Sequence, residues 1–163
     1  MSIRVGIGYD VHQLAKGHKF WLGGIEINHT KGSVGHSDGD VLIHAICDAM
    51  LGAVAMRDIG FHFPDTDPNL KGVDSKVLLK RVQLLISDKG YGIGNIDSTI
   101  CLQNPKLKNI IPEMQRTLEQ ILGLPGGTVS VKASTTESLG FVGREEGVSA
   151  YAVVMLIKET KHE

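Results

Sequence analysis

The stretch IRVGIGYDVH, residues 3–12, alternates apolar residues with glycine and polar residues. This period of two predicts a β-strand with one apolar face. Gly6, Gly8, Asp10 and His12 fall together on the other face, because side chains two positions apart on a strand share a face. A carboxylate beside an imidazole suits a borderline metal such as zinc. Taken alone, however, the pair favours a plain structural role, because Asp-x-His occurs often by chance.

Capping residues predict three helices in the rest of the chain. The first is expected to begin at Ser37 or Asp38 and the second at Asp74, since both residue types cap helix N-termini. The third carries Pro112 near its start and ends at Gly123.

The remaining apolar runs predict strands, so that strands and helices alternate. The last strand is apolar on both faces, which predicts a central position covered on both sides. We therefore expect an α+β fold (α/β two-layer), with a mixed four-stranded sheet covered by helices on one face, plus a small β-hairpin, in one domain of residues 1–163. The hairpin turns at Gly23-Gly24, and the strands besides the first are expected at residues 96–103, 128–134 and 148–157.

Composition excludes several classes of protein. The 163 residues include 17 Lys and Arg against 18 Asp and Glu, a net charge of −1, and 42% are hydrophobic. This balance excludes intrinsic disorder and disfavours binding to nucleic acid through bulk charge. No apolar stretch is long enough to span a membrane, and the start of the chain has no signal-peptide pattern. With two distant cysteines, Cys47 and Cys101, we expect a cytoplasmic protein that binds neither nucleic acid nor membrane.

His44 strengthens the case for a metal site. It lies in the first predicted helix, with Asp40 four residues before it and Asp48 four residues after it, and these acids are expected to orient its second ring nitrogen. Asp10, His12 and His44 together would form a three-ligand site with an open fourth position, as catalytic zinc uses. The alternative is a solvated histidine between two acids, with no metal.

Two further segments carry groups that suit phosphate. The hydroxyl of Ser37 and the backbone at the helix start can bind a phosphate, although a simple N-cap is the commoner use. Residues 132–137 offer three hydroxyls and one acid, which suit phosphate oxygens and a hard cation. Arg144, in the glycine-containing segment 140–147, is a further phosphate candidate, although glycines that only form turns are the commoner case. No Gly-Lys-Ser/Thr loop, GxSxG motif or Cys–His pair is present, so covalent catalysis is not indicated.

Five motifs occur in order along nearly the whole chain: DVH at residues 10–12, HSDGDVLIH at 36–44, DIGFHFPDTD at 58–67, KASTTE at 132–137 and GFVGR at 140–144. Together they resemble the 2-C-methyl-D-erythritol 2,4-cyclodiphosphate synthase family. The resemblance implies a lyase of the non-mevalonate isoprenoid pathway. In this reaction the 2-phosphate of 4-diphosphocytidyl-2-C-methyl-D-erythritol 2-phosphate attacks the β-phosphorus, CMP leaves, and a cyclic diphosphate forms.

The resemblance also implies roles for individual residues. Asp10, His12 and His44 would hold Zn2+, and Glu137 would help to place Mg2+ or Mn2+ on the diphosphate. His36 and Thr135 would stabilise the transition state. The family is a homotrimer with active sites between subunits and an apolar central channel near Phe141 and Arg144. The implied substrate contacts are Asp10, Val11, His12, His36, Ser37, Asp58, Ile59, Gly60, Phe63, Pro64, Asp65, Thr66, Asp67, Leu102, Gln103, Asn104, Pro105, Lys106, Leu107, Lys108, Ser134, Thr135, Thr136, Glu137, Phe141 and Arg144.

Two positions depart from the family pattern. Ser134 stands where many members have Thr, which keeps the hydroxyl and removes a methyl group. Glu145 stands where we expect glycine, and its charge beside Arg144 argues against anion binding in the trimer channel.

Two other functions are compatible with the same residues. A zinc-dependent phosphohydrolase would use the open zinc position to activate water. A metal-stabilised binding module would use the metal for folding and would show no turnover.

Overall fold

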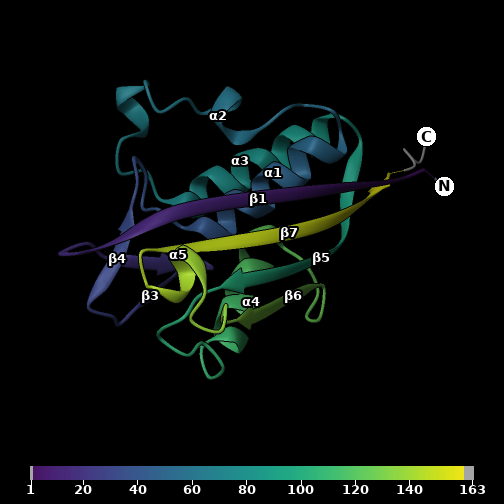
Figure 1. Ribbon diagram of the computed structural model, residues 1–163. Helices are drawn as coiled ribbons and strands as arrows, with labels where there is room; N and C mark the ends of the chain where they lie inside the picture. Colours follow the sequence, from purple (N-terminus) through teal and green to yellow (C-terminus); the bar gives the residue numbers. More distant parts are fainter. Residues whose placement is uncertain (1, 160–163) are drawn as a thin grey trace.

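The computed structural model describes residues 2–159 and contains two sheets (Figure 1). The larger has five strands in the order β4-β1-β7-β5-β6, and all its pairs are antiparallel except the parallel pair β5 and β6. The smaller is a hairpin of β2 and β3. The strands are β1 (Ile3–Lys16), β2 (Phe20–Leu22), β3 (Ile25–Ile27), β4 (Lys31–Val34), β5 (Tyr91–Cys101), β6 (Val129–Ser134) and β7 (Gly147–Lys158).

The long helices α1 (Val41–Ala53), α3 (Ser75–Asp88) and α4 (Ile111–Leu122) pack against one face of the large sheet (Figure 1). The short helix α2 (Ile59–His62) contacts α1, the 3-10 turn η1 (Pro68–Leu70) precedes α3, and the short helix α5 (Gly140–Gly143) contacts β7. None of the helices in residues 2–159 is long and apolar enough to cross a membrane. The predicted α+β class, the mixed sheet and the hairpin are confirmed. The sheet has a fifth strand, β4, because KGSV pairs with the end of β1 although it has no alternating pattern.

Helix α1 is buried over most of its surface, between β1 and β7 on one side and α3 on the other, and of its residues only Asp48 and Gly52 are not buried. Its close approach to β1 depends on two glycines. A Cβ atom at Gly6 would lie 1.9 Å from the carbonyl oxygen of Ala49, and one at Gly8 would lie 1.8 Å from that of Ala45. The glycine side of β1 is therefore the inner side, and a side chain at position 6 or 8 would push the helix away.

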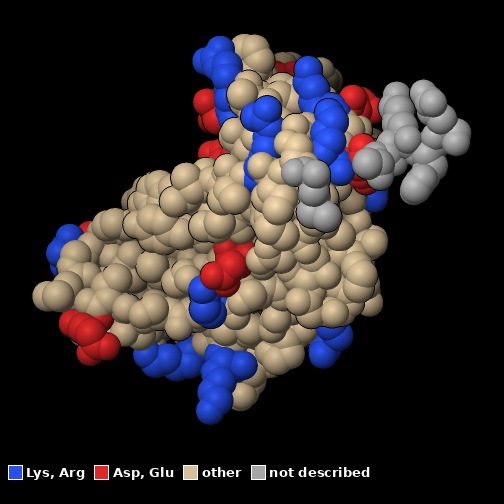
Figure 2. All heavy atoms as spheres, turned by 90° about the vertical axis from the view of Figure 1, so that its right-hand side faces the viewer, with Lys and Arg blue, Asp and Glu red and all other residues tan. Residues whose placement is uncertain are grey.

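The apolar side of β1 faces outward. Ile7 is 71% exposed, and on the neighbouring strand β7 its register partner Val153 is 42% exposed. β7 is central, as predicted, but helices cover only one of its faces, so the cover expected on its second face does not come from residues 2–159. Charged side chains are sparse over much of the side of the molecule that Figure 2 shows, and Lys and Arg gather toward its upper and lower margins.

The helix ends follow the expected chemistry with one exception. Asp74 caps α3, Pro112 lies in the first turn of α4, and Gly123 ends α4 in a left-handed conformation, as predicted. The expectation that Ser37 or Asp38 caps the first helix is wrong, because α1 begins later. Its cap is Asp40, whose side chain accepts a hydrogen bond from the backbone N–H of Ile43.

We expect Gly8→Ala to lower the free energy of unfolding by about 3 kcal/mol or more, because its methyl group overlaps the backbone of α1. Gly52→Ala is the matched control. Its Cβ would lie 4.0 Å from its nearest neighbour, the carbonyl oxygen of Ile7, so we expect a gain of about 0.5–1 kcal/mol from helix propensity. Urea denaturation at one protein concentration measures both. Similar midpoints for the two variants would contradict the close approach.

Candidate active site

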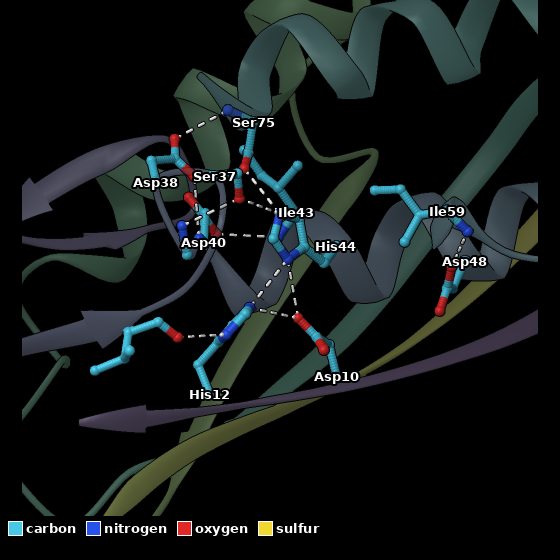
Figure 3. Close-up of polar contacts among 12 residues, drawn as sticks. Asp10, His12, Ser37, Asp38, Asp40, Ile43, His44, Asp48, Ile59 and Ser75 are labelled. Carbon is cyan, nitrogen blue, oxygen red and sulfur yellow. Dashed lines mark hydrogen bonds and ion pairs between the residues drawn. The ribbon is translucent and has the colours of Figure 1, made fainter. Parts of the chain in front are cut away.

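Strand β1 and helix α1 bring Asp10, His12 and His44 together (Figure 3). The Oδ2 atom of Asp10 lies 3.0 Å from Nε2 of His12 and 3.0 Å from Nδ1 of His44. The two ring nitrogens are 3.2 Å apart. The proximity that the sequence predicted for these three side chains is confirmed.

The chemistry of the three atoms fits a cation. Nδ1 of His12 lies 3.1 Å from the carbonyl oxygen of Val34, which can only accept, so Nδ1 carries the hydrogen and Nε2 presents its lone pair to the cluster. Zinc bonds of about 2.0–2.1 Å in tetrahedral geometry separate neighbouring ligand atoms by roughly 3.3 Å. The observed 3.0–3.2 Å separations require only small adjustments to accept such an ion.

Without a metal, protons supply the positive charge at this cluster. Burial raises the pKa of Asp10, but the short contacts with the His12 and His44 rings outweigh this effect and hold the pKa well below its ordinary value. Burial lowers the pKa of His12, yet the hydrogen bond and charge of Asp10 raise it above 6.5 overall. A metal ion therefore competes with protons, and its affinity falls as the pH drops through the raised pKa of His12.

The expectation that Asp40 and Asp48 orient His44 is wrong. Asp40 is fully buried and accepts from the backbone N–H groups of Gly23, Gly24 and Ile43, which ties the hairpin to the start of α1. Burial raises the pKa of Asp40. Asp48 accepts from a backbone N–H at the start of α2.

Two serines contact the second ring nitrogen of His44 instead. Its Nε2 atom lies 2.9 Å from Oγ of Ser75 and 3.2 Å from Oγ of Ser37 (Figure 3). Sequence reasoning named Ser37 but missed Ser75, because no local spacing connects the first residue of α3 with a histidine 31 positions earlier.

Most of the predicted substrate residues line two separate cavities. One, of about 390 Å³, contains the Asp10–His12–His44 cluster, and the other, of about 370 Å³, lies beside the ends of β5 and β6. The first is lined by Asp10, His12, Val34, Gly35, His36, Ser37, His44, Ile59, Gly60, Phe63, Asp65, Leu70, Val73 and Leu78. The second is lined by Leu102, Pro105, Lys106, Leu107, Lys108, Ile111, Ala133, Ser134 and Thr135.

The register of the large sheet shows how far apart these two cavities lie within one chain. Asp10 pairs with Ala150, Ala150 with Ile100, and Ile100 with Ala133. Three interstrand spacings place β6 about 14 Å from β1.

In the part of the chain that is described, Glu137 does not belong to the cluster of metal-ligating side chains. Its carboxylate accepts a hydrogen bond from Thr135 at 3.2 Å.

Several other predicted residues have local partners. Asp58 and Asp67 cap α2 and η1. Val11 lies on the exposed apolar face of β1, opposite Asp10.

The turn after α5 separates the charges of Arg144 and Glu145. Arg144 pairs with Glu146 through two 3.1 Å contacts. Glu145, with a positive φ of 57°, accepts from the Asn104 amide instead. The acid that offsets Arg144 is therefore Glu146, and Glu145 joins this turn to the loop beside the second cavity.

A family model described as the YgbB family matches residues 3–157. A 2-C-methyl-D-erythritol 2,4-cyclodiphosphate synthase from Bacteroides thetaiotaomicron is 58% identical over 159 residues, which are 98% of this chain and 100% of that protein. The chain belongs to this synthase family. The synthase of Bacteroides fragilis is 60% identical over 96% of the chain and 98% of its own length. Cyclodiphosphate synthases are phosphorus–oxygen lyases, so the chain is an enzyme of that class.

Two solved structures agree with the fold. The bifunctional IspDF from Campylobacter jejuni gives a TM-score of 0.93 at 41% identity, covering 98% of this chain and 43% of that one. A 2C-methyl-D-erythritol-2,4-cyclodiphosphate synthase solved with bound CDP gives a TM-score of 0.87 at 34% identity, covering 94% of this chain and all of the other.

We expect His44→Ala to keep the fold and to lose bound zinc, because it removes one of three converging ligand atoms. His18→Ala is the control, since His18 is an exposed histidine outside the cluster. Elemental analysis of purified protein measures zinc per chain, and circular dichroism checks folding. A folded His44→Ala variant with the wild-type zinc content would refute the ligand assignment.

Proposed function

We propose that this synthase converts 4-diphosphocytidyl-2-C-methyl-D-erythritol 2-phosphate into 2-C-methyl-D-erythritol 2,4-cyclodiphosphate and CMP, in non-mevalonate isoprenoid biosynthesis. The observation that carries the proposal is the convergence of Asp10, His12 and His44 in a cavity of a chain from this family. Bound Zn2+ would act there as a Lewis acid with an open position for a phosphate oxygen.

The reaction needs positioning and charge neutralisation more than proton transfer. The attacking 2-phosphate is already an anion, and the leaving CMP is a stabilised anion. The main obstacle is repulsion between phosphates, about 4 kcal/mol for two unit charges at 4 Å and an effective dielectric near 20. Residues that hold both phosphates in line can lower the barrier by about 7 kcal/mol or more.

In this proposal, residues of the first cavity hold the methylerythritol phosphate end. Nε2 of His36 is buried and has no hydrogen-bond partner among the described residues, which is costly unless a ligand supplies one. A phosphate oxygen would satisfy it. Ser37 lies beside His44 and would contact the same phosphate. The Asp58–Ile59–Gly60 segment and residues 63–67 would close the other side of this cavity.

Residues of the second cavity would hold the cytidine and its phosphates. Lys106 and Lys108 bring positive charge to this cavity, and Ser134 and Thr135 bring hydroxyls. Relatives solved with CDP support a cytidine nucleotide as ligand. Glu137, which accepts from Thr135, would help to hold Mg2+ or Mn2+ on the diphosphate.

A homotrimer would join the two cavities. They lie on strands that are three spacings apart in one chain, whereas the substrate must contact both at once. The exposed apolar side of β1 and β7 is suited to burial against other copies of the chain. We propose that three copies pack through this face, so that the second cavity of one chain meets the first cavity of its neighbour, around a channel near Phe141 and Arg144.

We expect Ile7→Glu to give monomers and to abolish activity, because it places a charge on the proposed interface. Leu84→Glu is the control: Leu84 is 57% exposed on α3, away from that face. Light scattering measures the molecular mass, and CMP release measures activity. The interface proposal fails if Ile7→Glu remains a trimer with wild-type activity.

Product analysis from the proposed substrate tests the reaction itself. We expect a cyclic diphosphate and one equivalent of CMP in a single turnover with Zn2+ and Mg2+ present. A linear product formed by attack of water would instead identify a phosphohydrolase. Zinc binding without turnover would identify a metal-stabilised binding module.

A further inference from the structure

We propose that Ser75 and Asp38 are positioning residues that hold His44 with its Nδ1 lone pair toward Asp10 and His12. This inference rests on the metal centre of the proposed function and adds two side chains to it. Ser75 is the first residue of α3, and Asp38 lies in the segment before α1 (Figure 3). Neither residue touches the proposed metal position.

Both oxygen atoms of the Asp38 carboxylate contact Ser75. Oδ1 accepts a short hydrogen bond from the Ser75 hydroxyl, and Oδ2 accepts from the Ser75 backbone N–H at 2.9 Å. Ser75 is fully buried, so its hydroxyl has no access to water. The chain of contacts then continues from Oγ of Ser75 to Nε2 of His44 at 2.9 Å.

The direction of these hydrogen bonds decides the tautomer of His44. A serine hydroxyl has one hydrogen, and an ionised carboxylate can only accept. Ser75 therefore donates to Asp38 and accepts from His44, so the His44 hydrogen resides on Nε2. Its Nδ1 atom is left with a lone pair, as a metal ligand requires. The negative charge of Asp38 polarises the hydroxyl and strengthens its bond to the imidazole.

The same contacts hold two segments of the site together. The Asp38 N–H donates to the carbonyl oxygen of Val73 at 3.2 Å, and the Gly72 N–H donates to that of His36 at 2.8 Å. The backbone of residues 36–38 is therefore joined to the residues that precede α3. Because Asp38 also accepts from the Asp40 N–H, it connects the start of α3 to the cap of α1.

Ser37 is the weaker of the two hydroxyl partners. Its Oγ atom is 3.2 Å from Nε2 of His44, it already accepts from Gly39, and it is partly exposed in the first cavity. Substrate can therefore contact Ser37, whereas Ser75 is enclosed. The structure assigns the orienting role to Ser75 for this reason.

Cobalt binding tests the assignment without any need for turnover. We expect Ser75→Ala to weaken Co2+ affinity about 10–100-fold, as is typical when a group that orients a metal ligand is lost, and to change the visible absorption of the bound cobalt. Ser75→Thr keeps the hydroxyl and should return affinity and spectrum to near wild type. Ser87→Ala, at an exposed position of the same helix, should change neither.

Each result decides the matter. Wild-type affinity and spectrum in folded Ser75→Ala would overturn the proposal. An equal loss in folded Ser75→Ala and Ser75→Thr would also overturn it, because the effect would then come from packing and not from the hydroxyl. Absence of cobalt binding by the wild-type protein would remove the metal centre itself, which separates failure of the proposed function from failure of this inference.

Discussion

The rest of the structure depends on the close contact between β1 and α1 over two glycines. Gly6 meets the backbone at Ala49, and Gly8 meets it at Ala45. Two residues of a strand advance about 6.6 Å, and four residues of a helix advance about 6.0 Å. Because β1 and α1 run in opposite directions, each step of two residues along β1 therefore meets a position four residues earlier in α1. The next inward position on β1 is Asp10, which lies beside the first turn of α1, where there is room for a side chain. His44 is in that turn, so the contact that packs the core also sets the distance between the metal-ligating groups.

Much of this arrangement could be predicted from the sequence, because it depends on patterns within short segments of the chain. Alternation in residues 3–12 placed Asp10 and His12 on one face, and the helix signals placed His44 in the first helix, but the sequence left open whether His44 faces the strand or the solvent. Strand β4 could not be predicted, because four residues with two small side chains carry no pattern and pair only where β1 provides an edge. Ser75 could not be predicted either, since its contact with His44 depends on how α3 packs beside α1.

The two faces of the sheet show a second limit of sequence reasoning. Apolar alternation predicts that a face is buried, but not what buries it. On β1 the helix covers the glycine side, and the side bearing Ile7 is exposed in the single chain. The apolar pattern on both faces of β7 therefore predicts burial of both faces, whereas a single chain buries only one of them. This is the physical basis for the proposed trimer, in which the two cavities, on different strands of one chain, would meet between neighbouring chains.

Charge explains why the proposed chemistry requires metal ions. Within the described residues, the first cavity is lined by two carboxylates, Asp10 and Asp65, and by no lysine or arginine. Arg144, which the sequence offers as a phosphate ligand, is already paired with Glu146. A phosphate entering the first cavity would thus meet negative charge of its own sign, unless a cation is held between them. The two imidazoles and the Asp10 oxygen converge where such a cation would lie, and in our proposal the hydrogen bond to the buried Ser75 hydroxyl holds one of those imidazoles in the orientation that receives it.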